Sequence, residues 1–106
     1  YLLYYKNKNI KIIAYGPGPT FKDKNSHKVP INRWFGNENQ RNKVTDYFNS
    51  YYKKKCNQNN IPFFTLFYDL IDEHYNTLDN YHLNDSMHLS IKVIPLIIKY
   101  IKLLDI

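Results

Sequence analysis

An acidic side chain and an imidazole stand three positions apart near the end of the chain, at Asp85 and His88 in the stretch NDSMHLS. Residues at this spacing in a turn can meet, so the Asp85 carboxylate can accept a hydrogen bond from one ring nitrogen of His88. That contact would fix the tautomer and leave the second ring nitrogen available as a general base, which is how a hydroxyl nucleophile is activated. We therefore treat Asp85 and His88 as candidate catalytic residues. The alternative is that Asp85 is only a turn residue that precedes a helix.

Two short apolar runs predict the strands of a parallel sheet. Residues 10–15 (IKIIAY) are rich in β-branched side chains, and residues 61–68 (IPFFTLFY) are rich in aromatic ones. Runs of this length, apolar on both faces, are typical of buried strands. The GPGP stretch at residues 16–19 cannot continue a hydrogen-bonded ladder, so we expect a rigid loop near the cleft, at the carboxyl end of the first strand.

Helical periodicity follows each of these runs. From about residue 39 to residue 56, apolar side chains recur at the spacing of one helix face: Val44, Tyr47, Phe48, Tyr51, Tyr52 and Cys56. We expect this face to be buried, which makes its tyrosines packing residues rather than stacking platforms for nucleic-acid bases. Ser90 can cap a final helix that has a second such face: Val93, Leu96, Ile97, Tyr100, Ile101 and Leu104. Pro95 should kink the first turn of that helix or move its regular start later.

The remaining segments are predicted to be less regular. Residues 1–5 have the character of the last turns of a helix. Residues 69–84 are polar and show no sustained period. Residues 20–36 should form a long surface loop that three large apolar side chains hold down: Ile31, Trp34 and Phe35.

The order of these elements is helix end, strand, helix, strand, helix. This alternation predicts an α/β domain with a parallel sheet, right-handed crossovers and helices on the faces of the sheet. Two strands do not form a stable open sheet, so we expect residues 1–106 to be a single partial domain, the carboxyl-terminal part of a larger one. In open α/β sheets the functional crevice lies beyond the carboxyl ends of the strands. Asp85 and His88 follow the second strand on that side.

A resemblance to a known family begins at these two residues. The stretch DSMHLS resembles the last conserved block of the SGNH, or GDSL-like, hydrolases, in which Asp-x-x-His precedes the final helix. IKIIAYGPGP is similar to a strand and proline-containing loop of that family, and VTDYFNSYYKKKCNQNNIPFFTLF is similar to its next helix and strand. The resemblance implies a three-layer α/β/α sandwich with a parallel sheet, SGNH- or flavodoxin-like, of which only the C-terminal βαβα portion is present. It also implies hydrolysis of an acyl or acetyl ester on a lipid or a glycan, with His88 as general base and Asp85 as its orienting partner.

The other catalytic groups of that family have no match in this chain. The family's nucleophilic serine lies in a Gly-Asp-Ser motif, and a glycine and an asparagine form its oxyanion hole, so the resemblance places all three before Tyr1. None of the serines here lies in such a context: Ser26, Ser50, Ser86 and Ser90. A base without a nucleophile performs no acyl transfer, so we expect the 106 residues alone to be inactive toward esters.

Composition restricts the partners. With 43% hydrophobic residues in 106, the chain supports one small core, and lysines interrupt each apolar run, so we expect no membrane span. Cys56 is the sole cysteine and the histidines His27 and His74 lie far apart, so we expect no metal and no cofactor. The net charge of +6 raises nucleic acid as a partner, although lysine and asparagine are abundant along the whole chain and a solvated surface explains them more simply.

Two alternatives to an esterase therefore remain open. One is a non-catalytic relative that binds a glycan or a lipid. The other is a small basic module whose binding to nucleic acid would depend strongly on salt.

Overall fold

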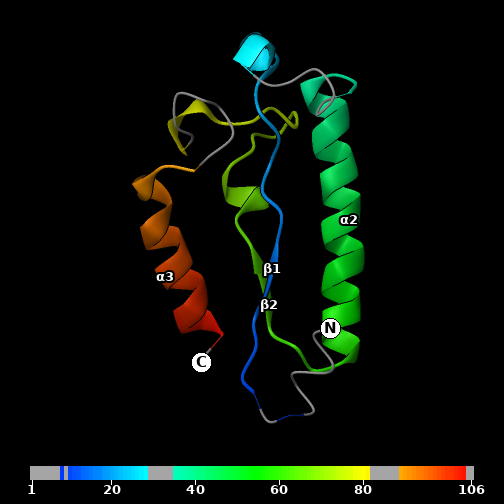
Figure 1. The fold of residues 1–106 in the computed structure, drawn as a ribbon, viewed down its shortest axis with the longest axis vertical. Helices are drawn as coiled ribbons and strands as arrows, with labels where there is room; N and C mark the ends of the chain where they lie inside the picture. The colour runs from blue at the N-terminus through cyan, green and yellow to red at the C-terminus, as the bar shows by residue number, and fades with distance from the viewer. Residues whose placement is uncertain (1–7, 9, 29–34, 82–88, 105–106) are drawn as a thin grey trace.

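The computed structural model describes residues 8, 10–28, 35–81 and 89–104. Within them the chain has a mixed α/β fold with a two-stranded parallel sheet and two α-helices. Figure 1 shows the two strands between the two helices, so each helix covers one face of the sheet. The predicted α/β class and the parallel pairing are confirmed, whereas the predicted helix at residues 1–5 lies outside the described residues.

The strands are shorter than the apolar runs that predicted them. Strand β1 covers Ala14–Gly16 and strand β2 covers Phe63–Thr65, with Ala14 opposite Phe63 in the ladder. The backbone N–H of Ala14 donates to the Pro62 carbonyl at 2.8 Å. In a parallel ladder the bonded positions of a strand alternate, so the backbone groups of Phe63 and Thr65 face the edge of β2 away from β1.

Helix α2 (Glu38–Gln58) connects the two strands, close to the predicted bounds. It begins with a capping box in which the Asn37 side chain accepts from the Gln40 backbone N–H at 2.8 Å and the Gln40 side chain accepts from the Asn37 N–H at 2.9 Å. Asn59 is its C-cap, and Asn60 adopts the left-handed conformation with φ 56° that commonly follows a helix.

The buried face of α2 is not the predicted one. The side chains of Val44, Tyr47, Phe48 and Tyr51 are 48–79% exposed. The buried residues of α2 are instead Glu38, Arg41, Asn42, Asn49 and Cys56. Of the predicted apolar stripe, Cys56 is buried and Tyr52 is half-buried, as expected. The prediction was wrong because side-chain polarity alone cannot anticipate that the neighbouring loops supply hydrogen-bond partners for a polar face.

Helix α3 (Ile94–Leu103) follows the prediction more closely. Ser90 caps a short 3-10 turn at Ile91–Val93 by accepting from the Lys92 N–H at 3.3 Å, and the regular helix starts only after it. Pro95 thus falls in the first turn, where a backbone N–H has no intrahelical partner to lose. Val93, Leu96, Ile97 and Tyr100 of the predicted face pack inward, whereas Ile101, also predicted to be on that face, is exposed.

Two apolar clusters hold the helices to the sheet. On the side of α2, Ala14, Cys56 and Ile61 form a buried group that Ile12, Tyr52 and Phe63 extend. On the side of α3, Leu66, Leu70 and Val93 form a second group, and half-buried side chains surround it: Phe64, Tyr81, Leu89, Leu96, Ile97 and Tyr100. In the predicted loop before α2, Phe35 is 71% exposed and holds nothing down, while Phe21 is buried in its place. Ile31 and Trp34 lie outside the described residues.

Gly16 marks the closest approach of β1 to α2. A Cβ at this position would lie 2.3 Å from the Asn49 Oδ1 atom and 2.7 Å from the Phe63 ring. We expect Gly16→Ala to lower the free energy of unfolding by about 1–3 kcal/mol, because either β1 or α2 must move to make room. Urea titration followed by circular dichroism measures this loss.

Gly18→Ala is the matched control, because a Cβ at Gly18 would have no atom within 4 Å. Its expected change is within about 0.5 kcal/mol. Equal losses for the two variants would contradict the close packing of β1 against α2.

Candidate functional site

The two predicted catalytic residues, Asp85 and His88, lie outside the described residues. The described residues on either side of them lie close together. The backbone N–H of Ser90 donates to the Tyr81 carbonyl at 2.7 Å, so Tyr81 and Ser90, on either side of the motif, lie next to each other. Leu89, the neighbour of His88 in the sequence, packs against the apolar cluster under α3. Figure 1 shows the yellow segment before the motif and the orange segment after it on the side to which both strands point.

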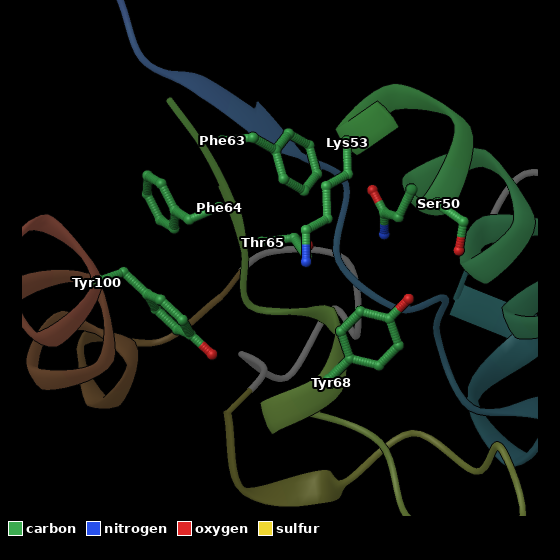
Figure 2. Close-up of a pocket in the computed structure, with 8 residues that line it drawn as sticks. Ser50, Lys53, Phe63, Phe64, Thr65, Tyr68 and Tyr100 are labelled. Atoms are coloured by element: carbon green, nitrogen blue, oxygen red, sulfur yellow. The ribbon is translucent and has the colours of Figure 1, made fainter. Parts of the chain in front are cut away.

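A pocket of about 370 Å³ opens beside β2, between α2 and α3. Its floor consists of β2 itself and Tyr68, which follows shortly after the strand. Figure 2 shows Lys53 extending from α2 toward β2, with Phe64 and Tyr100 on the side of α3. The volume falls in the range of small-molecule sites in proteins.

The wall of the pocket on the α2 side is polar and consists of Asn49, Ser50 and Lys53. The Asn49 amide nitrogen donates to the Pro17 carbonyl at 3.0 Å, but the amide oxygen, although buried, accepts no hydrogen bond in the described structure. Thr65 also donates to the Pro17 carbonyl, at 3.1 Å. The GPGP loop therefore supports two pocket residues through a carbonyl group.

Tyrosine hydroxyls lie at two corners of the pocket, each bonded to a carboxylate. Tyr68 donates to Asp46, and its hydroxyl also bonds with Ser50. Burial, with the Asp46 carboxylate as a further cause, raises the pKa of Tyr68 above the ordinary value. Tyr100 donates to Asp69 at 2.6 Å, and this hydrogen bond, helped by burial, raises the pKa of Tyr100 to about 12. Both hydroxyls therefore remain protonated and neutral at physiological pH.

A second group of polar side chains lies at the start of α2 and is satisfied internally. Arg41, which is 7% exposed, donates to Thr20 Oγ1 at 2.9 Å, to the Gly36 carbonyl at 2.6 Å and to Asp23 Oδ1 at 2.8 Å. Its guanidinium also lies 4.2 Å from the centre of the Phe21 ring. One buried cation thus joins the loop before α2 to the helix.

Glu38 and Asp23 exchange hydrogen bonds with each other's backbone. The Glu38 carboxylate accepts from the Asp23 N–H at 3.1 Å, and the Asp23 carboxylate accepts from the Glu38 N–H at 3.0 Å. Glu38 accepts a further bond from the Thr77 N–H at 2.6 Å. Burial would raise the pKa of Asp23, but the hydrogen bonds from Glu38 and Arg41, with the nearby positive charges of Arg41 and Lys22, lower it overall.

Asn42 completes this group and is fully buried. Its amide oxygen accepts from the Thr20 N–H at 2.9 Å, and its amide nitrogen donates to the Tyr75 carbonyl at 2.8 Å and to Thr77 Oγ1 at 3.1 Å. We call Glu38, Arg41 and Asn42, with Thr20, Asp23 and Thr77, the polar clamp. Since its donors and acceptors satisfy one another, its role is to fix loops, and it offers no unused group to a ligand.

Sequence reasoning missed both the polar clamp and the polar wall of the pocket. Glu38, Arg41, Asn42 and Asn49 recur at i, i+3, i+4 and i+11, which is helical spacing for one face. That spacing was readable, but only the loops around residues 20 and 77 reveal that the face is buried. Ser50, which lies in no Gly-Asp-Ser context, is part of the pocket wall.

The described residues contain neither a cluster of metal ligands nor a membrane-spanning helix. Among the described residues, no group of three or more His, Cys, Asp and Glu side chains is arranged to hold a metal ion. Neither of the two described α-helices combines the length and the apolar character that crossing a membrane requires. Cys56 is a free, buried thiol, and burial raises its pKa, which disfavours the reactive thiolate.

The fold and the pocket define a mixed α/β protein with a small-molecule-sized site along one strand edge. No family model, curated protein or solved structure matches the chain. The functional assignment therefore depends on the residues and their geometry.

Replacing Asn42 with leucine tests the polar clamp. The change leaves the Thr20 N–H, the Tyr75 carbonyl and the Thr77 hydroxyl without a partner in a buried place, so we expect the free energy of unfolding to fall by about 2–4 kcal/mol. Tyr47→Ala is the control on the same helix, and we expect a change within about 0.5 kcal/mol because Tyr47 is 79% exposed. If Tyr47→Ala lowered the free energy of unfolding more than Asn42→Leu, the apolar face of α2 would be the buried one.

The polar clamp should also weaken in acid. Since the pKa of Asp23 is lowered in the folded protein, its carboxylate stabilises the fold above about pH 4, the unfolded value, and this contribution is lost as the pH falls through the folded value. We expect Asp23→Asn to flatten the decline of unfolding free energy below about pH 4. Thermal melts from pH 7 to pH 2.5 measure it, and an unchanged acid slope would show that Asp23 does not carry this dependence.

Proposed function

We propose that this chain is the carboxyl-terminal part of an ester hydrolase of the SGNH type, whose complete domain is a three-layer α/β/α sandwich. The observation that carries the proposal is the position of the pocket. It lies beside the second of two parallel strands, next to the apolar cluster that includes Leu89, and Leu89 directly follows the Asp-x-x-His motif in the sequence. A crossover helix on one face of the sheet and a terminal helix on the other also support this architecture.

In this proposal His88 is the general base and Asp85 orients it. His88 removes the proton of a serine hydroxyl as the oxygen attacks the ester carbonyl, and then gives that proton to the departing alcohol. Water repeats the cycle on the acyl-enzyme and releases a carboxylic acid. In this proposal the serine and the oxyanion donors belong to a part of the complete domain outside this chain, and no cofactor takes part.

The pocket beside β2 would hold a portion of the ester away from the reacting carbonyl. Its size suits a single sugar ring or a short acyl chain, and its walls combine aromatic rings with hydroxyl, amide and ammonium groups. A glycan or lipid ester therefore remains the substrate class of the proposal.

A fluorophosphonate probe on the full-length natural protein tests the proposal, because only an activated serine reacts with it rapidly. We expect the wild-type protein to be labelled and His88→Ala to lower the labelling rate by about 10²-fold or more. The control is His74→Ala, because His74 is an exposed histidine that lies 3.4 Å from the neighbouring Glu73 and does not line the pocket. We expect no labelling of the 106 residues alone.

Two outcomes would overturn the assignment. Absence of labelling in the full-length protein would favour a non-catalytic binding relative. Labelling that His88→Ala leaves unchanged would remove His88 from the mechanism.

A further inference from the structure

The edge of β2 that faces away from β1 carries backbone groups without a partner. Because the bonded positions of a parallel strand alternate, the N–H and C=O groups of Phe63 and Thr65 point to this edge. In the described part of the chain, these groups have no hydrogen-bond partner outside the ladder. Phe63 and Thr65 also line the pocket, so the pocket lies along an unpaired strand edge. We call these backbone groups the β2 edge.

The two helices form walls on either side of the β2 edge. The pocket is lined by Ser50 and Lys53 of α2 on one face of the sheet and by Tyr100 of α3 on the other. Figure 2 shows Tyr100 on one side of β2, while Lys53 reaches toward the strand from the other side. A further strand would lie about 4.8 Å from β2, with about 3.3 Å for each residue along it. A space bounded by two helices along an unpaired strand edge suits an extended chain.

The two walls favour different side chains on such a chain. The side chain of Phe63 packs on the α2 side, and that of Phe64 packs on the α3 side. Residues opposite each other in neighbouring strands place their side chains on the same face. The exposed Lys53 ammonium forms no ion pair among the described residues, so an acidic side chain opposite Phe63 or Thr65 can pair with it. Opposite Phe64, an apolar side chain suits the cluster under α3.

We propose that the β2 edge binds an extended acidic segment of a partner protein, which adds a third strand to the sheet. Backbone hydrogen bonds to Phe63 and Thr65 supply the affinity, and acidic side chains on both sides of one apolar residue supply the sequence preference. The proposal concerns binding alone and does not depend on esterase activity. The added strand and the ester of the proposed hydrolase would exclude each other from the pocket.

A second copy of this chain is a less suitable occupant. Pairing of two β2 edges about a twofold axis would bring both Lys53 side chains into one interface, and each chain has a net charge of +6. The same charges attract an acidic segment and raise its rate of association. The other explanation is that Lys53 only keeps the β2 edge unpaired, since lysines on exposed strands commonly oppose pairing. Peptide binding distinguishes these explanations.

Titration of the ¹⁵N-labelled 106-residue protein with short peptides tests the proposal by chemical-shift changes. The peptide Gly-Glu-Val-Glu-Gly, blocked at both ends, carries the expected pattern. Its lysine analogue reverses the charge, and N-methylation of its three central residues removes the backbone donors but keeps the side chains. We expect saturable binding of the glutamate peptide with a dissociation constant on the order of 1 mM, and binding at least about tenfold weaker for both controls.

The position of the shifts tests the geometry. The N–H groups of Phe63 and Thr65 would gain hydrogen bonds to the peptide, whereas the N–H group of Phe64 faces β1. We therefore expect larger shifts for the amides of Phe63 and Thr65 than for the amide of Phe64. Association through charge alone would not produce this alternation.

Variants at two neighbouring lysines separate a specific contact from general attraction by the basic chain. Lys53→Met keeps the length of the side chain and removes the charge. We expect it to weaken binding of the glutamate peptide about tenfold and to leave binding of the glutamine analogue unchanged. Lys54→Met is the matched control, because Lys54 is exposed and does not line the pocket. We expect it to bind the glutamate peptide as the wild-type protein does.

Four results would contradict the proposal. These are no saturable shift at about 10 mM peptide, ten times the expected dissociation constant, equal binding of either control peptide, no alternation of the shifts along β2, and equal losses in Lys53→Met and Lys54→Met. Binding by the 106 residues but not by the full-length natural protein would also contradict it, because a strand of the complete domain would then fill the β2 edge. Failure of fluorophosphonate labelling with intact peptide binding would remove the esterase and leave the strand site.

Discussion

The buried guanidinium of Arg41 and its two helix neighbours, Glu38 and Asn42, form the interaction on which the rest of the structure depends. These side chains satisfy backbone and side-chain groups in one loop that lies 15 or more residues away in the chain and in another that lies more than 30 residues away. A buried ion and its hydrogen bonds contribute little net free energy compared with a well-packed apolar group, but removing one partner leaves the others unpaired and is costly. The polar clamp therefore specifies where α2 begins relative to both loops.

Fixing the start of α2 also fixes the wall of the pocket. Asn42 and Asn49 lie seven residues apart, two helical turns along the same face, so the residue that holds the loops and the residue that lines the pocket move as one rigid element. Gly16 allows this element to come close to β1, since any side chain there would displace the Asn49 amide or the Phe63 ring. The pocket is thus formed by the packing of α2 against the sheet, and the exposed lysine at its rim is the part free to meet a ligand.

The same arrangement relates the pocket to the Asp-x-x-His motif. Phe64 and Tyr100 belong both to the pocket and to the apolar cluster under α3, and Leu89 packs into that cluster. A ligand in the pocket would therefore share its aromatic wall with the chain that leads into the motif. In a complete domain of the proposed type, this geometry would place ester binding and proton transfer at the same end of the sheet.

The sequence by itself determined the α/β alternation, the parallel strands, the approximate extent of α2 and most of the inward face of α3, because local periodicity and a capping residue such as Ser90 act over a few positions. The sequence also identified Asp85 and His88 as candidate catalytic residues. Only the tertiary structure decided which face of α2 is buried. The apolar side chains of Tyr47 and Tyr51 predicted that their face is buried. Instead, the loops around residues 20 and 77 provide partners for Arg41 and Asn42, and the Pro17 carbonyl provides one for Asn49. Burial of a polar side chain depends on donors and acceptors that come from distant parts of the chain, and no local pattern contains them.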